Sequence, residues 1–476
     1  MLITSINFVL FASLTLAVYY LLPRRPQNVW LLFVSYIFVV SWDSKFAAVL
    51  GMVTTVNFLI ALRLRINDQG QRGLLWLGIG FNVLALVFFR AAGFFLPQLE
   101  AKLGSLGLFT QTGGLQVLIP LGLSYYVLQA ISYLVDVYRG QLKAESDFVD
   151  FALYLGYFPK LIAGPIERAR TFLPRLAQPR LVDNQVIAKS TMLIFVGLGR
   201  KLLIADTLNA SFLPDVFEFP ARYNPTELII WLIIYAFALY NDFAGYTDIV
   251  RGISGLFGIE LSPNFHAPYF SRNFTEFWKR WHITLSEWLR DYVYFPLSRI
   301  LSRASPSHRN LANFVLPPLL TMLVSGMWHG FSLNMIIWGG LHGIYQIAER
   351  IPSLWRPIVP PQNLPVWKQS LGTVVVFSFV ILAWVPFHWE LPAAFDSWEA
   401  LLNWSDISIR YRRLFLIWPI VLGSLLLDWY QYHSRDEFIF LKWSPLAKAA
   451  CMAIVLFWLF IVTGGDFEQP FIYQAF

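Results

Sequence analysis

Long apolar runs recur along the whole chain, and breaks rich in basic or turn-forming residues separate them. A helix needs about 20 apolar residues to cross about 30 Å of hydrocarbon. About a dozen runs approach or exceed a length typical of membrane helices, and they lie at residues 8–22, 28–42, 46–62, 73–89, 113–135, 184–199, 228–240, 311–324, 336–348, 371–389, 414–427 and 449–464. Several are short enough to be re-entrant or interfacial. The pattern predicts an all-α, polytopic transmembrane protein with about 10–12 membrane helices plus re-entrant and interfacial helices.

The composition supports this class. Hydrophobic residues make up 57% of the 476 residues and charged residues only 14%, whereas water-soluble domains carry about 25% charged residues. The net charge of +7 needs no nucleic acid, because basic residues are favoured at the cytoplasmic ends of membrane helices. The single cysteine, Cys451, lies in an apolar run, so we expect a packing residue and no disulfide framework.

Charge around the first runs predicts how the chain is oriented. Residues 1–22 are uncharged and Arg24 and Arg25 follow them, which is the reverse of a secretory signal and indicates a retained first span with its N-terminus outside. The chain shows no internal repeat and no low-complexity linker, so we expect one domain over residues 1–476.

Residues 274–294 combine aromatic and charged side chains, which predicts an amphipathic helix at the membrane surface. On one helix, His282, Ser286 and Arg290 would share a face, and Glu276 could pair with Arg280. A plain supporting helix is the simpler interpretation of this segment on its own.

His329 ends an apolar run in the sequence Ser325-Gly-Met-Trp-His-Gly. An ionisable side chain in a membrane-embedded segment is costly and commonly marks a functional site, and Gly326 and Gly330 leave room for a substrate or another backbone. A packing histidine satisfied by a carbonyl is an equal alternative on these residues alone. His342 ranks lower, because thirteen residues do not return to the same helix face unless the backbone bends.

The other histidines and two aspartates give weaker evidence of a functional site. We expect structural or surface roles for the other four histidines, because no cluster of polar residues surrounds them in the sequence. They are His266, His308, His388 and His433. Asp242 and Asp248 are six residues apart and do not share a helix face; they could orient a histidine or cap a broken helix.

The segment 158–165 contains two prolines and a glycine, which predicts a re-entrant turn that lines a cavity. The chain contains no phosphate-binding loop, zinc-ligand spacing or nucleophilic serine motif. ATP hydrolysis, a bound metal and serine-hydrolase chemistry are therefore not expected.

Taken together, the segments 158–165, 241–248, 264–294 and 325–343 resemble the membrane-bound O-acyltransferase (MBOAT) superfamily, within it the bacterial alginate O-acetyltransferase branch. The resemblance runs over core motifs at 119–343 and is specific, because FWKRWHITLSEWLRDYVY followed by GMWHG is not a chance combination. It implies a fold with a central channel, with His329 as the catalytic histidine and His282 near it.

The resemblance implies acyl transfer, with acetyl-CoA as the expected donor and no bound cofactor. In that mechanism His329 is the general base and His282 orients a reactant, while Lys279, Arg280 and Arg290 attract a phosphate-bearing donor. Further substrate-binding candidates are Trp328, Ser286, Asp242, Asp248 and Asn334. The expected acceptor is an exported polysaccharide, reached through an outer-face acyltransferase partner, and the expected location is the bacterial inner membrane. D-alanyl transfer to teichoic acid, peptidoglycan O-acetylation and a non-catalytic transporter or scaffold remain alternatives.

Overall fold

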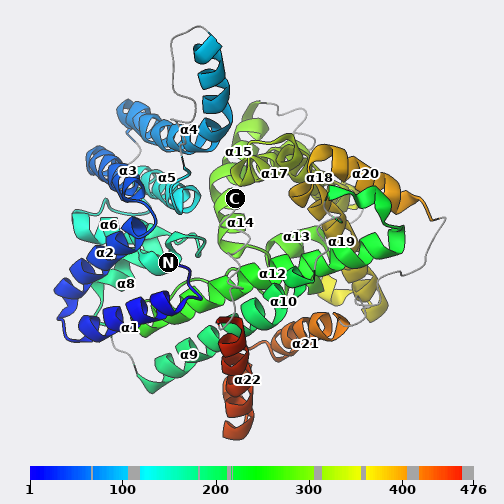
Figure 1. The fold of residues 1–476 in the computed structure, drawn as a ribbon. Helices are drawn as coiled ribbons and strands as arrows, with labels where there is room; N and C mark the ends of the chain where they lie inside the picture. The colour runs from blue at the N-terminus through cyan, green and yellow to red at the C-terminus, as the bar shows by residue number, and fades with distance from the viewer. Residues whose placement is uncertain are drawn as a thin grey trace. The chain divides into compact units, whose positions relative to one another are not determined.

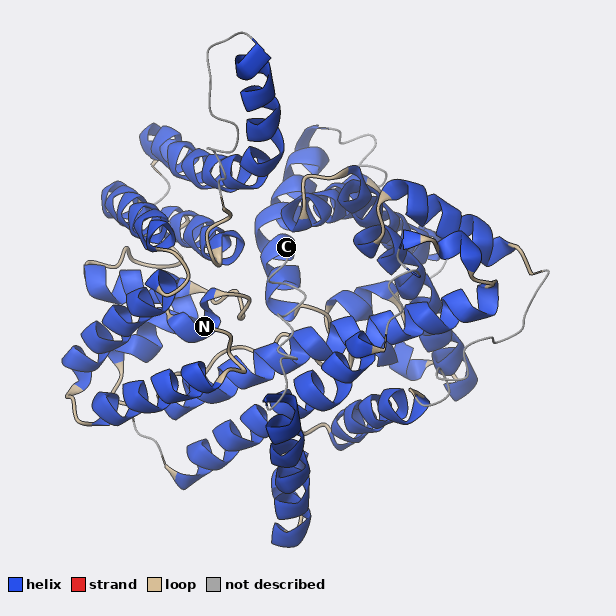
Figure 2. Cartoon of the chain, viewed as in Figure 1, coloured by secondary structure: helices blue, strands red, loops and turns tan. Residues whose placement is uncertain are grey.

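The chain folds into helices joined by loops, as Figures 1 and 2 show. The computed structural model describes residues 1–65, 68–105, 118–180, 183–211, 216, 218–304, 314–354, 361–404 and 417–463. No residue in these ranges lies in a strand. The predicted all-α class is confirmed.

One compact unit comprises Met1–Ile187 and Ile253–Leu261. Its helices are α1 (Ile6–Tyr20), α2 (Arg24–Val40), α3 (Ser44–Arg63), α4 (Arg72–Ser105), α5 (Leu123–Tyr138), α6 (Phe148–Gly156), α7 (Phe158–Leu161) and α8 (Ala169–Ala177). Helices α2 and α3 both pack against α6. Asp150 of α6 accepts hydrogen bonds from Asn28 at 2.7 Å and Arg25 at 3.1 Å, which ties α6 to α2.

The second unit comprises Ala188–Gly252 and Ser262–Phe476. Its elements up to residue 304 are most of α9 (Asn184–Leu198), the π-helical turn η2 (Gly199–Asp206), α10 (Thr207–Ala210), most of α12 (Pro225–Leu256), α13 (Phe274–Trp278), α14 (Ile283–Leu289), the π-helical turn η5 (Arg290–Tyr294) and α15 (Phe295–Ala304). The later helices are α17 (Leu316–His329), α18 (Leu333–Arg350), α19 (Val366–His388), α20 (Leu391–Leu402), α21 (Trp418–Ser434) and α22 (Pro445–Thr463). The prediction of a single domain stays a prediction.

Each predicted apolar run contains a helix within the described residues, although some run ends, such as residues 118–122, are not helical. Residues 113–117, 311–313, 414–416 and 464 of those runs lie outside the described residues. Four helical stretches within the described ranges are long and apolar enough to cross a membrane: Ser44–Arg63, Arg72–Ala91, Pro225–Leu256 and Val366–His388. Of these, the most apolar stretch of α12 is 89% buried inside the protein, against 17% for Arg72–Ala91. Protein therefore surrounds α12, which can carry polar side chains at membrane depth.

The segment 158–165 is interrupted, as its prolines and glycine predicted. Helix α6 ends at Gly156, the short α7 follows, and residues 164–168 run without helix. Lys160 is fully buried within α7, where its ammonium group donates to the Tyr154 carbonyl at 2.6 Å and to Gln129. The break in the helix is confirmed, and the cavity that it was expected to line stays a prediction.

Helices α17 and α18 form an antiparallel hairpin whose backbones approach closely at glycines. A Cβ atom on Gly326 would lie 2.1 Å from the Met335 carbonyl oxygen, and one on Gly339 would lie 2.3 Å from that of Met322. Gly326 thus makes room for another backbone. The hairpin brings α18 back alongside the end of α17, where His329 lies.

We predict that Gly339→Ala destabilises the protein whereas Gly340→Ala does not. The first methyl group would collide with a carbonyl oxygen, and such overpacking typically costs about 1–3 kcal/mol. The second would lie 4.0 Å from Leu323 Cδ2, an ordinary contact, and alanine favours a helix by about 1 kcal/mol over glycine. Thermal unfolding of the purified protein in detergent measures both, and equal melting temperatures for the two variants would contradict the close packing.

Candidate active site

His329 is the last residue of α17 and is packed among aromatic rings. Only 5% of the residue is exposed. Its ring centroid lies 4.8 Å from Trp328, 5.0 Å from Trp338 and 5.3 Å from Phe387, each ring edge-to-face with it. Contacts of this kind restrict the orientation of the imidazole.

His282 lies in a tight turn between α13 and α14, where it takes the N-cap position of α14 with φ of 43° and ψ of 55°. This left-handed conformation is uncommon for residues other than glycine. The residue is 1% exposed, and its ring meets Phe243 of α12 edge-to-face at 4.8 Å. The turn therefore points the imidazole into the protein.

Hydrogen bonds from a distant loop hold this turn. The backbone oxygen of Asn264 accepts from Ile283 N at 2.8 Å, and its side-chain oxygen accepts from Thr284 N at 3.2 Å and Thr284 Oγ1 at 2.7 Å. On the other side of His282, the His266 N–H donates to the Arg280 carbonyl at 3.0 Å. Because both flanks are bonded, the left-handed residue between them is fixed in place.

Trp328 contacts both histidines. Its ring centroid is 6.0 Å from His282 and 4.8 Å from His329. The structure thus brings together three of the residues singled out in the sequence, contributed by the α13–α14 turn and the end of α17.

The prediction of one continuous amphipathic helix over 274–294 is wrong. Helix α13 ends at Trp278 and α14 begins at Ile283, because the bonded turn intervenes. The predicted shared face of His282, Ser286 and Arg290 is therefore also wrong. The Arg290 side chain is 49% exposed beside Asp291, at 2.9 Å, whereas His282 is buried.

Most of the other residues predicted to bind substrate form hydrogen bonds or ion pairs within the protein. Ser286 Oγ donates to the Trp281 carbonyl at 3.0 Å, and Asn334 Nδ2 to the Trp389 carbonyl at 2.6 Å. The expected pair of Arg280 with Glu276 is confirmed at 2.7 Å. Lys279 lies exposed on the turn beside His282.

Asp242 and Asp248 do not cap a broken helix, because α12 continues through both to Leu256. Asp242 pairs with Lys201 at 2.6 Å. Asp248 lies 3.6 Å from Arg200 and 3.4 Å from Arg251. In the structure, both carboxylates form ion pairs inside the protein.

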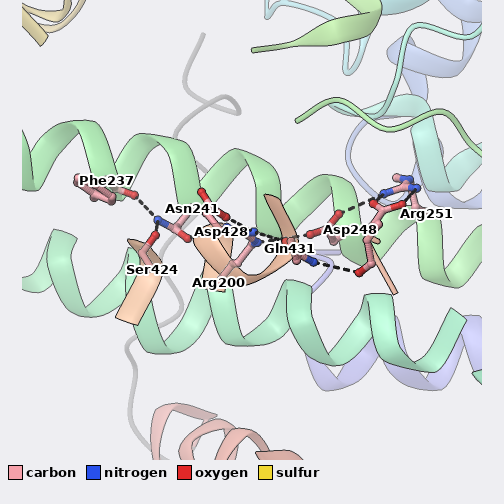
Figure 3. A network of polar contacts seen from close by, with 9 residues as sticks. Arg200, Phe237, Asn241, Asp248, Arg251, Ser424, Asp428 and Gln431 are labelled. Carbon is pink, nitrogen blue, oxygen red and sulfur yellow. Dashed lines mark hydrogen bonds and ion pairs between the residues drawn. The ribbon is translucent and has the colours of Figure 1, made fainter. Parts of the chain in front are cut away.

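Sequence analysis missed the network around Arg200, which Figure 3 shows. The guanidinium of Arg200, 4% exposed in its side chain, donates to Asp428 at 2.6 Å, to Asn241 at 3.2 Å and to Gln431 at 3.3 Å. These residues come from η2, α12 and α21. The one signal in the sequence was an acidic residue, Asp428, directly after an apolar run, which calls for an internal partner.

The bend on which a shared position of His342 and His329 depends is present, and the lower rank of His342 stays a prediction. The reversal between α17 and α18 supplies the required bend, so Trp338 lies 5.0 Å from His329 and 5.0 Å from His342. His342 is fully buried. Of the other histidines, His308 lies outside the described residues.

Comparison with known proteins identifies one family and relatives named for acyl transfer. The model of the membrane-bound O-acyltransferase (MBOAT) family matches residues 141–387, which include both candidate histidines. The chain is 34% identical to a "Probable alginate O-acetylase" of Azotobacter vinelandii over 89% of this chain and 82% of that protein. It is 30% identical to a "Peptidoglycan O-acetyltransferase" of Helicobacter pylori, over 82% and 77% of the two chains. A "Teichoic acid D-alanyltransferase" of Bacillus subtilis is 28% identical, over 56% and 69%.

We predict that His282 makes the folded protein less stable in mild acid. Burial lowers the pKa of His282 to about 3, whereas an unfolded histidine titrates near 6.5. Below pH 6.5 the unfolded state binds a proton that the folded state does not, so stability falls by about 2 kcal/mol between pH 7 and pH 5. The His282→Asn variant, whose side chain tolerates the left-handed backbone, should show a smaller drop in melting temperature over this range. An unchanged drop would contradict the assignment.

We also predict that Arg200→Leu is strongly destabilising, because it removes the cation that pairs with the buried Asp428 at 2.6 Å. Removing one partner of a buried ion pair typically costs about 3–5 kcal/mol. The control is Arg290→Leu, which removes an exposed pair, typically contributing about 0–1 kcal/mol. Thermal unfolding and the yield of folded protein in the membrane measure both effects. Comparable behaviour of the two variants would contradict a structural role for the network.

Proposed function

The chain belongs to the membrane-bound O-acyltransferase (MBOAT) family, and we propose that it transfers an acetyl group from a cytoplasmic thioester towards hydroxyl groups of an exported polysaccharide. Membership rests on the family match over residues 141–387 and on relatives that align with most of the chain. The chain is accordingly an O-acyltransferase and a multi-pass membrane protein.

The observation that supports the proposed site best is the position of His329 beside Trp328 and His282. His329 ends an apolar helix, which is an expensive place for an imidazole unless it has a function. Its ring is held by aromatic contacts and its neighbour Trp328 also contacts His282. Two histidines held in fixed positions by separate elements can serve two roles, one as base and one in orienting a reactant.

In the proposed step, a ring nitrogen of His329 takes the proton from an acceptor hydroxyl while that oxygen attacks the thioester carbonyl. The new C–O bond forms, the C–S bond breaks, and the leaving thiolate takes the proton back from the imidazolium. Proton transfer by a positioned side chain contributes typically about 10²- to 10⁴-fold to the rate. His282, held neutral by its burial, is proposed to orient the acyl group or the acceptor.

Acetyl-CoA is the proposed donor. Its phosphates would be attracted by basic groups at the cytoplasmic surface. Of the three cations expected to do this, Arg280 and Arg290 already pair with carboxylates. Lys279 is exposed and lies three residues before His282, so we propose it as the first contact for the donor.

The acceptor is proposed to be an exported polysaccharide of the alginate type. A relative named for alginate acetylation matches the chain at 34% identity over 89% of its length, against 28% over 56% for one named for teichoic acid. Because such a polymer lies outside the cell, the acyl group would have to cross the bacterial inner membrane within the protein. An outer-face acyltransferase partner would then complete the transfer.

We predict that His329→Ala, made in the native host, reduces ester-linked acetyl groups on the surface polysaccharide by about 10²-fold or more, since the general base is lost. The measurement is base-released acetate per mass of polysaccharide. Membrane levels of the variant should equal those of the wild type.

The matched control is His433→Ala, which removes an exposed histidine of α21 and should leave the ester content unchanged. Wild-type ester content in the His329→Ala strain, with normal amounts of the variant in the membrane, would refute the enzymatic role of His329. It would favour a transporter or scaffold.

A further inference from the structure

Three buried side chains that contact one another, one of which also contacts His329, carry polar atoms without a hydrogen-bond partner. They are Trp278 of α13 and Trp338 and His342 of α18, exposed by 9%, 1% and 0%. Their rings contact one another, with Trp278 and Trp338 at 6.0 Å and each of them 5.0 Å from His342. We refer to these three residues as the indole–imidazole cluster.

The polar atoms of the cluster are Trp278 Nε1, Trp338 Nε1 and both ring nitrogens of His342. Within the described part of the chain none of the four has a hydrogen-bond partner. A buried hydrogen-bond donor or acceptor that has no partner lowers stability, and folded proteins contain very few such atoms. Four in one cluster call for a partner that the chain itself does not supply.

The chemistry of the cluster specifies that partner. The two indoles can only donate, and a neutral imidazole donates once and accepts once, so donors outnumber acceptors. No ion pair or cation–π contact involves these residues in the described ranges. A charged ligand group would therefore be buried without a counter-ion, at high cost. A neutral oxygen acceptor fits, such as a carbonyl or a sugar hydroxyl.

The cluster is also in the right place, because Trp338 contacts His329 and His342 at the same distance. We propose that Trp278, Trp338 and His342 form a substrate subsite beside His329, in which they hydrogen-bond a neutral oxygen of the acyl donor or of the acceptor sugar. This rests on the proposed acyl transfer. His342 is the residue that can both donate and accept in this subsite.

A binding role and a packing role make opposite predictions for His342→Leu. Leucine has a similar volume and no polar atom, so in the empty protein it removes two unpaired nitrogens and should not lower the melting temperature. If the ring binds substrate, the same change weakens binding. His342→Asn, which keeps a donor and an acceptor, should retain part of the binding.

The kinetic measurements use permeabilised cells of the native host, which contain the full-length protein together with any outer-face partner, with acetyl-CoA as donor and de-esterified alginate oligosaccharide as acceptor. Melting temperatures are measured on the full-length protein in detergent. We expect His342→Leu to raise the KM for one of these substrates about three- to tenfold, with a melting temperature no lower than the wild type. An effect on the acetyl-CoA KM assigns the subsite to the acyl donor, and an effect on the oligosaccharide KM assigns it to the sugar. Tyr345→Phe, which removes a hydroxyl from a neighbouring ring on α18, should change neither KM.

Unchanged KM values for both substrates, or a folded His342→Leu protein whose melting temperature without substrate is lower than that of the wild type, would overturn the proposal. If His342→Leu does not fold, Trp278→Phe removes one donor while keeping an aromatic ring, and the same criteria apply. The stabilisation of each protein by added acetyl-CoA or oligosaccharide is measured as well, because it reports binding without turnover. A wild type that binds but transfers no acetyl group would refute the proposed function, whereas a substrate-induced stabilisation that His342→Leu leaves unchanged would refute the subsite.

Discussion

Charged side chains buried away from water constrain the second unit of this protein more than any other feature. Helix α12 is surrounded by protein and carries Asp242 and Asp248. A charge buried alone costs far more than a charge that is paired and hydrogen-bonded. The partners, Arg200 and Lys201, are consecutive residues of the π-helical turn η2. Since both must reach α12 at once, they fix how η2 lies along it.

The same helix connects this ionic pairing to the candidate site. Asn241 and Asp242 are engaged by Arg200 and Lys201, and the next residue, Phe243, packs its ring against His282. Phe243 also contacts Phe265, at 5.0 Å, in the loop that holds the His282 turn. Any rotation of α12 that improved one set of contacts would disturb the other. The position of His282 thus depends on the ion pairs as well as on the hydrogen bonds of its own turn.

Local information in the sequence was sufficient for most of the helices and for singling out His329 as a candidate, whereas His282 was singled out through the family resemblance. Hydropathy over a run of about 20 residues is a property of the run itself, and an imidazole at the end of such a run is conspicuous wherever it occurs. The break at residues 279–282 was not predictable in this way. It is imposed by Asn264, which bonds to Thr284 from a loop twenty positions earlier.

Contacts between residues far apart in the sequence also explain why the Arg200 network and the position of His342 were not predicted. The bond from Arg200 to Asp428 joins residues 228 positions apart, so neither residue indicates its partner. His342 appeared remote from His329 because helical spacing assumes a straight helix. The chain instead reverses between α17 and α18, and both histidines come to contact Trp338.

The protein treats its buried polar groups in two different ways, and the difference follows from one electrostatic property. In surroundings of low dielectric constant a hydrogen bond or ion pair is stronger than in water, and an unpaired polar group is correspondingly more costly. Around Arg200 the chain supplies the partners itself, which fixes the packing of η2, α12 and α21. Around His342 it does not, within the described residues. A site arranged in this way is held in readiness for a ligand, because the surroundings that penalise the empty state also strengthen the bonds that a bound oxygen would form.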